Sequence, residues 1–173
     1  MGNTVYLVVG VPGAGKSWVC RQLGDKFNYI PHDRCWSHPT EKPDAGLDPK
    51  WCKGSKSTHI ETLVKEAKSS EKPLLTEVPF GERKVKEDLE AKGLRVKTIF
   101  VIEDPKVVSS RYEAREGKPL YKGAVTRAST IKDRAREWNS FAGTSSEVLK
   151  HLQDLNITER MTSQQWRQFN KGA

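Results

Sequence analysis

One eight-residue stretch near the N-terminus constrains the fold more than any other part of the chain. Residues 10–17 read GVPGAGKS and match the pattern G-x-x-x-x-G-K-[ST] at every fixed position. A continuous apolar, β-branched run at 5–9 precedes the stretch, as expected of a buried parallel strand. Residues 17–23 follow it and are typical of a helix with one apolar face. Strand, glycine-rich loop and helix start together predict an α/β fold with a phosphate-binding loop.

The residue types of this loop indicate how it would bind a triphosphate. Glycines let the backbone curl so that successive N–H groups point at phosphate oxygens, and the start of a helix adds partial positive charge. We expect Lys16 to reach the β- and γ-phosphates and the Ser17 hydroxyl to ligate Mg²⁺. ATP and Mg²⁺ are therefore the expected cofactors. The expected nucleotide contacts are Gly10, Val11, Pro12, Gly13, Ala14, Gly15, Lys16 and Ser17.

Composition limits the protein class but leaves the partner open. A length of 173 residues is typical of one domain, and no apolar run is long enough for a membrane span. Three cysteines without framework spacing fit a reducing, cytoplasmic compartment. The net charge of +8 favours a polyanionic partner such as nucleic acid, although lysines that only solubilise the protein explain it equally well.

A charged pair follows the short second strand expected at 28–30. Asp33 and Arg34 would lie where open α/β sheets bind ligands, at the carboxyl edge beside the loop. Asp33 is a candidate general base for an attacking hydroxyl, and Arg34 is a candidate contact for an acceptor phosphate. The alternative is a surface turn with an ordinary ion pair.

The segment 34–56 is rich in proline and glycine and shows no helical or strand period, so we expect a substrate-side loop. Trp36 and Trp51 share it with Lys50, Lys53 and Lys56, a combination that suits stacking on single-stranded nucleic acid. Packing of both indoles under the loop is the alternative. The same region holds four side chains of the types that ligate zinc, although their spacing fits no standard template: His32, Cys35, His38 and Cys52.

The third strand expected at 73–76 ends at Glu77. This carboxylate could orient Mg²⁺-bound water or the acceptor, and a solvent-exposed glutamate is the alternative. A charged helix then begins at Gly81-Glu82-Arg83.

A second group of candidates follows the fourth strand, expected at 96–102. Asp104-Pro105 begins a helix whose residues Arg111 and Arg115 lie four apart and so share a face. We expect 111–123 to form an arginine-bearing lid that stabilises the charge of a migrating phosphoryl group. A basic helix end exposed to solvent is the alternative.

Two features are expected nearer the C-terminus. A helix is expected from Thr126 to Phe141, and a loop after Gly143 with Thr144 against the nucleotide base. Residues 156–173 are expected to form a small helix or tail.

With these residues assembled, the chain resembles the P-loop kinase domain of phage polynucleotide 5′-hydroxyl kinases. It is also similar to related phage kinases that act on 5-hydroxymethyl-pyrimidine DNA, over roughly residues 4–155. The resemblance implies a general-base role for Asp33 and a substrate contact by Arg34, and it sets Arg83 against an arginine of the family's signature after the third strand. Trp36 and Glu77 are further candidate substrate contacts, Trp36 through stacking and Glu77 through its place at the edge of the sheet. The chain departs from the family where a short Asp would end the third strand and Glu77 stands instead.

The sequence therefore predicts a three-layer P-loop NTPase-type domain at 1–155, with a parallel sheet of four or five strands and helices on both faces. The leading functional prediction is an ATP-dependent phosphotransferase acting on a hydroxyl in nucleic acid, DNA more than RNA, at a 5′-end or a hydroxymethylated base. Alternatives are a small-molecule, nucleoside or nucleotide kinase, a non-catalytic ATP-binding module, and a hydrolytic ATPase.

Overall fold

The computed structural model describes residues 4–24, 26–31, 56–78 and 81–155, with only the backbone described at 56–58. Five parallel strands form one sheet in the order β2-β3-β1-β4-β5. Their bounds are β1 (Thr4–Val9), β2 (Asn28–Tyr29), β3 (Leu74–Val78), β4 (Arg95–Val101) and β5 (Phe141–Gly143). The predicted parallel α/β sheet is therefore confirmed. β1 lies at its centre, so the loop that follows β1 is at the middle of the carboxyl edge.

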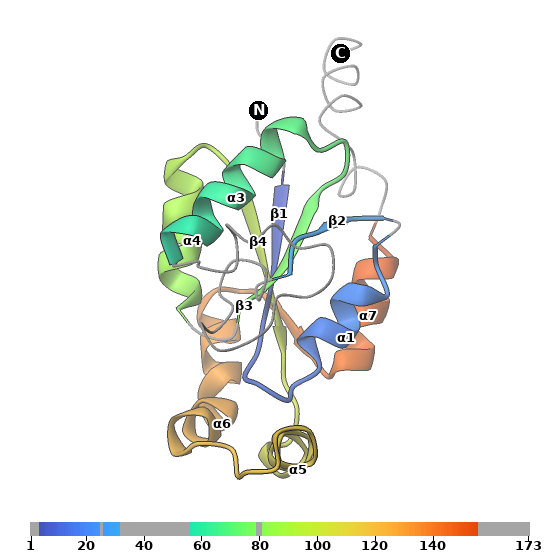
Figure 1. Cartoon of the computed structure of the whole chain (residues 1–173), viewed down its shortest axis with the longest axis vertical. Coiled ribbons are helices and arrows are strands. Elements are labelled where there is room, and N and C mark those ends of the chain that lie inside the picture. Colours follow the sequence, from blue (N-terminus) through green and yellow to red (C-terminus); the bar gives the residue numbers. More distant parts are fainter. Residues whose placement is uncertain (1–3, 25, 32–55, 79–80, 156–173) are drawn as a thin grey trace.

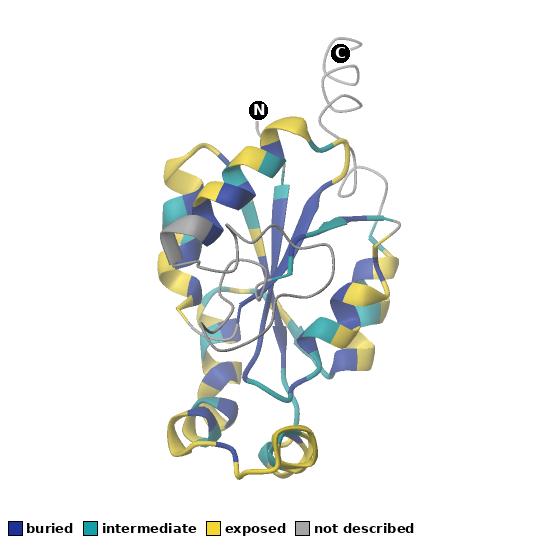
Figure 2. Cartoon of the chain, viewed as in Figure 1, coloured by how far each residue is buried: buried dark blue, intermediate teal, exposed yellow. Residues whose placement is uncertain are grey.

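Helices cover both faces of this sheet (Figure 1). α1 (Lys16–Arg21) and α7 (Ser145–Gln153) cover one face, and α3 (Lys56–Ser69) and α4 (Glu82–Ala91) cover the other. The alternation of β1 explains the two cores, because Tyr6 and Val8 pack into the first and Val5, Leu7 and Val9 into the second. Figure 2 shows the strands buried throughout their central part and the outer faces of the helices exposed.

Two further helices of the described residues form a hairpin at the carboxyl edge of the sheet (Figure 1), and the second half of α6 (Lys122–Glu137) also packs on the face covered by α3 and α4, through Ile131 and Ala135. α5 (Pro105–Glu116) begins with the side chain of Asp104 as its N-cap and ends at Gly117, which has a left-handed φ of 71°. Four residues, 118–121, separate that cap from the start of α6. The segment 111–123, predicted as a lid, is therefore the end of one helix, a turn and the start of the next.

Both boundaries of one predicted helix are wrong. The helix expected at Thr126–Phe141 begins earlier, at Lys122, and ends at Glu137. Asn139 then takes a left-handed φ of 49°, which turns the chain away from the helix axis. Phe141 consequently belongs to β5, where it pairs in register with Ile99 of β4.

None of the helices in the described part of the chain has the length and apolar character needed to cross a lipid bilayer.

Candidate active site

The loop at 10–17 has the backbone geometry of an anion-binding cradle. Gly13 and Gly15 have left-handed φ values of 89° and 99°, which residues with a Cβ rarely adopt. A Cβ at Gly13 would also lie only 2.7 Å from the carbonyl oxygen of Val108. The Gly10 N–H donates to the Val78 carbonyl at 3.3 Å and so holds the start of the loop against β3. Because α1 begins at Lys16, the partially positive end of this helix lies at the end of the loop.

Lys16 lies within this cradle. Its side chain is buried, and its Nζ donates to the carbonyl oxygen of Val11 at 2.9 Å. The ammonium group is therefore held against the loop's own backbone, where phosphate oxygens bound by the loop would meet it.

Glu77, at the carboxyl end of β3, lies beside Ser17. In the sheet register it faces Val8 of β1, and it is 4% exposed, so the alternative of a solvent-exposed glutamate is wrong. The Tyr29 hydroxyl interacts with both the Glu77 carboxylate and the Ser17 hydroxyl, which shift its pKa in opposite directions. Burial and then the charge of Glu77 raise the pKa of Tyr29 far above its ordinary value, so Tyr29 stays a neutral donor. Ser17, Tyr29 and Glu77 thus form an oxygen-rich group at one end of the loop.

The charges of Glu77 and Lys16 also affect the pKa of the Cys20 thiol, one turn into α1. Burial raises its pKa well above the ordinary value, Glu77 raises it further, and Lys16 lowers it. Glu77 and Lys16 therefore both lie close behind the loop, and the buried Cys20 stays a neutral thiol.

Arg111 reaches the loop from α5. Its Nη1 donates to the carbonyl oxygen of Ala14 at 3.5 Å and lies 3.6 Å from Glu103 Oε1. The same Glu103 oxygen accepts from the Ser145 N–H at 3.2 Å and from Ser145 Oγ at 3.1 Å. The sequence analysis named Arg111 but missed Glu103 and Ser145. The available signal was the position of Glu103, which follows β4 as Glu77 ends β3.

The other predicted contact residues near the loop have different partners. Arg115 pairs with Glu116 at 2.9 Å, and its guanidinium lies 5.7 Å from the centre of the Tyr112 ring. The Thr144 hydroxyl accepts from the Glu147 N–H at 3.3 Å and caps α7. Of Arg111, Arg115 and Thr144, Arg111 is the residue that the structure shows in contact with the loop.

Arg83 lies in a separate arginine cluster between α4 and α6. It pairs with Glu137 at 3.0 Å, and its guanidinium lies 5.5 Å from the centre of the Trp138 ring. Its neighbour Glu82 is almost fully buried and pairs with Arg127 and with Arg134, the latter at 3.3 Å. This cluster joins two helices and was not expected from the sequence.

Several predicted site residues lie outside the described residues: Asp33, Arg34, Trp36, His32, Cys35, His38 and Cys52. Their proposed roles as base, substrate contacts and zinc ligands stay predictions. Within the described ranges, no group of three or more His, Cys, Asp or Glu side chains is arranged to hold a metal ion.

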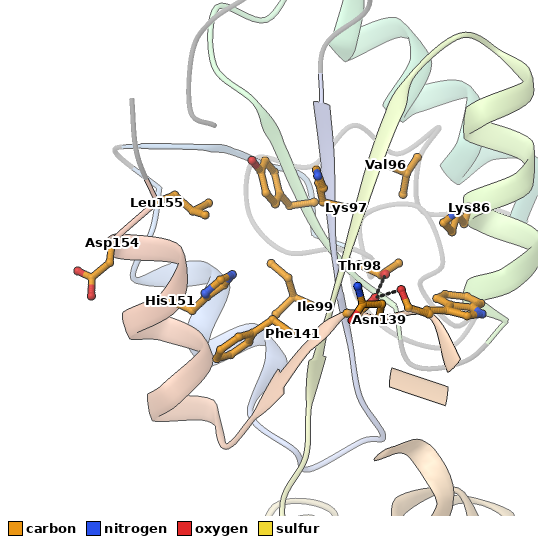
Figure 3. A pocket seen from close by; sticks show the side chains of 13 residues that line it. Lys86, Val96, Lys97, Thr98, Ile99, Asn139, Phe141, His151, Asp154 and Leu155 are labelled. Carbon is orange, nitrogen blue, oxygen red and sulfur yellow. Dashed lines mark hydrogen bonds between the residues drawn. The ribbon is translucent and has the colours of Figure 1, made fainter. Parts of the chain in front are cut away.

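A groove of about 640 Å³ lies along β4, away from the loop (Figure 3). β5 pairs only with Ile99–Val101, so the groove follows the earlier residues of β4. Trp138 lines one part, and the stacked rings of Phe141 and His151, 3.9 Å apart, line another. It contains no residue of the 10–17 loop, so the groove is not the candidate nucleotide site.

Comparison with known proteins places this geometry in a structural context. The sequence matches no protein-family model and no curated protein. Among solved structures, a gluconokinase from Sinorhizobium meliloti aligns with a TM-score of 0.57 and 19% identity, over 86% of this chain and 88% of that one. A tunicamycin resistance protein from Deinococcus radiodurans aligns with a TM-score of 0.54 and 18% identity, over 86% of this chain and 92% of that one.

Shikimate kinase from Acinetobacter baumannii, solved with shikimate, aligns with a TM-score of 0.53 and 16% identity, over 90% of this chain and 93% of that one. The chain has the fold of these P-loop kinases. At such low identity the likeness establishes the fold, and the relation to phage polynucleotide kinases stays a prediction.

Proposed function

We propose that the protein is an ATP- and Mg²⁺-dependent kinase that transfers the γ-phosphate to a hydroxyl group of a small molecule. The observation that carries the proposal is the 10–17 loop, with its two left-handed glycines, the buried Lys16 and Arg111 across it. Backbone N–H groups, an ammonium and a guanidinium converge there, as binding and transfer of a triphosphate require.

The residues around the loop divide the chemical work. Lys16 and the loop amides would bind the β- and γ-phosphates, because both present N–H donors at the same place. The residues that would hold Mg²⁺ are Ser17 and Glu77, since hydroxyl and carboxylate oxygens suit this ion and the two lie together. Bound Mg²⁺ would neutralise charge on the phosphates.

Arg111 would stabilise the charge that spreads over the phosphoryl group during transfer. Asp33 is proposed as the base that receives the proton of the acceptor hydroxyl, on the strength of its position after β2 in the sequence.

The neighbours favour a small acceptor. Gluconokinase and shikimate kinase are named for small hydroxylated molecules, and each is covered over most of its length. A nucleic-acid acceptor remains the second candidate because of the net charge of +8. The two differ in salt dependence, since neutralising several phosphates releases counterions and a small acceptor does not.

The experiment is transfer of label from γ-labelled ATP. The acceptors are a panel of sugars, polyol acids and nucleosides, together with oligonucleotides that carry a free 5′-hydroxyl or a hydroxymethylated base. We expect label on at least one small acceptor, little change between low and high salt, and loss of label with Lys16→Ala. Label on oligonucleotides alone, falling steeply with salt, would replace the small acceptor by nucleic acid. ATP hydrolysis without any acceptor would contradict a kinase function.

A further inference from the structure

A single carboxylate oxygen joins three parts of the fold beside the phosphate-binding loop. Glu103 Oε1 belongs to the turn between β4 and α5, and it accepts from both the N–H and the hydroxyl of Ser145, the first residue of α7. The same oxygen lies 3.6 Å from Arg111 Nη1, on the second turn of α5. Glu103 therefore connects the start of α7 to the arginine that contacts the loop.

These groups meet over one glycine of the loop. A Cβ placed on Gly15 would lie 3.0 Å from the Ser145 Cβ and 3.7 Å from Arg111 Nη1. The Arg111 guanidinium also donates to the carbonyl of Ala14, the residue before that glycine. Any phosphate held by the loop amides would consequently lie within reach of Arg111.

The two partners of the ion pair differ in freedom. The Glu103 side chain is 11% exposed and is fixed by Ser145, whereas Arg111 is 46% exposed and long enough to take many rotamers. A fixed carboxylate that restricts such a side chain lowers the entropy lost when the guanidinium binds a ligand.

From this geometry we propose that Glu103 is a positioning residue for the nucleotide site, which holds Arg111 over Gly15 ready to bind the phosphates of ATP. The inference rests on the proposed function, since it needs the loop to bind a triphosphate. Glu103 acts through Arg111 and does not itself contact the ligand.

The direction in which Glu103→Gln changes the affinity for ATP distinguishes a positioning role from a purely electrostatic one. Glu103→Gln removes a negative charge next to an anion site, so Coulomb interaction alone would strengthen ATP binding. Gln keeps an oxygen that accepts from Ser145, so the start of α7 retains its partner. If Glu103 positions Arg111, the same substitution weakens binding because the guanidinium loses its fixed partner.

The test measures the dissociation constant of Mg·ATP by calorimetry for the full chain and its variants. We expect Glu103→Gln to weaken binding about fivefold and Arg111→Ala about tenfold, with the double variant within about twofold of Arg111→Ala. Glu113→Gln is the matched control, because Glu113 is an exposed glutamate on α5, the helix that carries Arg111. We expect this variant to bind Mg·ATP within about twofold of wild type.

Unchanged or tighter binding by Glu103→Gln, or a fivefold loss that persists in the Arg111→Ala background, would overturn the proposal. If Glu103→Gln does not fold, Glu103→Asp takes its place in the comparison with Arg111→Ala and the double variant. The shorter Asp side chain keeps the charge but moves the carboxylate oxygen away from Arg111, so the same loss of Mg·ATP affinity is expected. Wild-type protein that binds Mg·ATP but phosphorylates no acceptor would refute the proposed function, and the affinities would still decide the inference. Wild-type protein that does not bind Mg·ATP would refute both.

Discussion

Glu82 and Glu103 each bind arginine side chains beyond the carboxyl ends of the strands, and they differ in how much of the arginine they leave exposed. Glu82 is 1% exposed and pairs with Arg127 and Arg134, which are 26% and 33% exposed. Glu103 leaves Arg111 46% exposed beside the loop. A fully buried carboxylate must be neutralised by its partners, so the Glu82 arginines are committed to holding α4 against α6. Arg111 is restrained but accessible, as binding an anion requires.

The largest effect on stability is expected from a substitution of Glu82. Replacing it by Gln removes the charge that neutralises two arginines, and we expect the free energy of unfolding to fall by about 3 kcal/mol. Urea denaturation monitored by circular dichroism measures this change. The affinity of the folded variant for Mg·ATP should stay within about twofold of wild type, because Glu82 lies in the α4–α6 cluster. A normal stability with a tenfold loss of affinity would mean that the roles of the two clusters are reversed.

Arg111→Ala should show the opposite pattern. We expect the turnover number to fall roughly 100-fold, because a donor aimed at the developing phosphoryl charge is lost. Stability should change by less than about 1 kcal/mol, since Arg111 is 46% exposed and Glu103 keeps its hydrogen bonds with Ser145. Steady-state kinetics and urea denaturation provide the two measurements. Arg136→Ala is the matched control, because Arg136 is an exposed arginine that pairs with Asp133 on α6. An equal loss of turnover in both variants would indicate a general effect of charge.

The smallest expected effect is at Arg83. Arg83→Ala removes an exposed pair with Glu137 and a contact with the Trp138 ring, so we expect the free energy of unfolding to fall by about 1 kcal/mol at most. The sequence analysis instead predicted a substrate contact, for which the KM of the acceptor would rise. Thermal denaturation together with acceptor titration separates the two. A tenfold rise in KM at unchanged stability would support the sequence-based prediction.

The fold was accessible from the sequence because its signals are local. The run at 5–9, the glycine loop and the Asp104-Pro105 cap each act within a few residues, and the structure has a strand, a loop and a helix start where they indicate. β5 was missed because its three residues have too little pattern of their own and gain strand structure by pairing with β4. The wrong end of the preceding helix has the same cause.

The site was accessible only in part. The loop motif names its own residues, but the contact of Glu103 with Ser145 joins positions 42 apart in sequence and depends on how α7 packs. Thr144 shows the limit clearly. The sequence predicts Thr144 against the nucleotide base, and this contact stays a prediction. In the structure the Thr144 hydroxyl caps α7, and it is Ser145 that packs over Gly15.

Calorimetric binding of Mg·ATP to wild-type protein and to Lys16→Ala tests most directly that residues 10–17 form a triphosphate site. We expect wild type to bind and the variant to lose roughly 100-fold in affinity, because a buried ammonium that meets the phosphates is removed. Equal affinity in the two proteins, or no binding by wild type, would contradict the account.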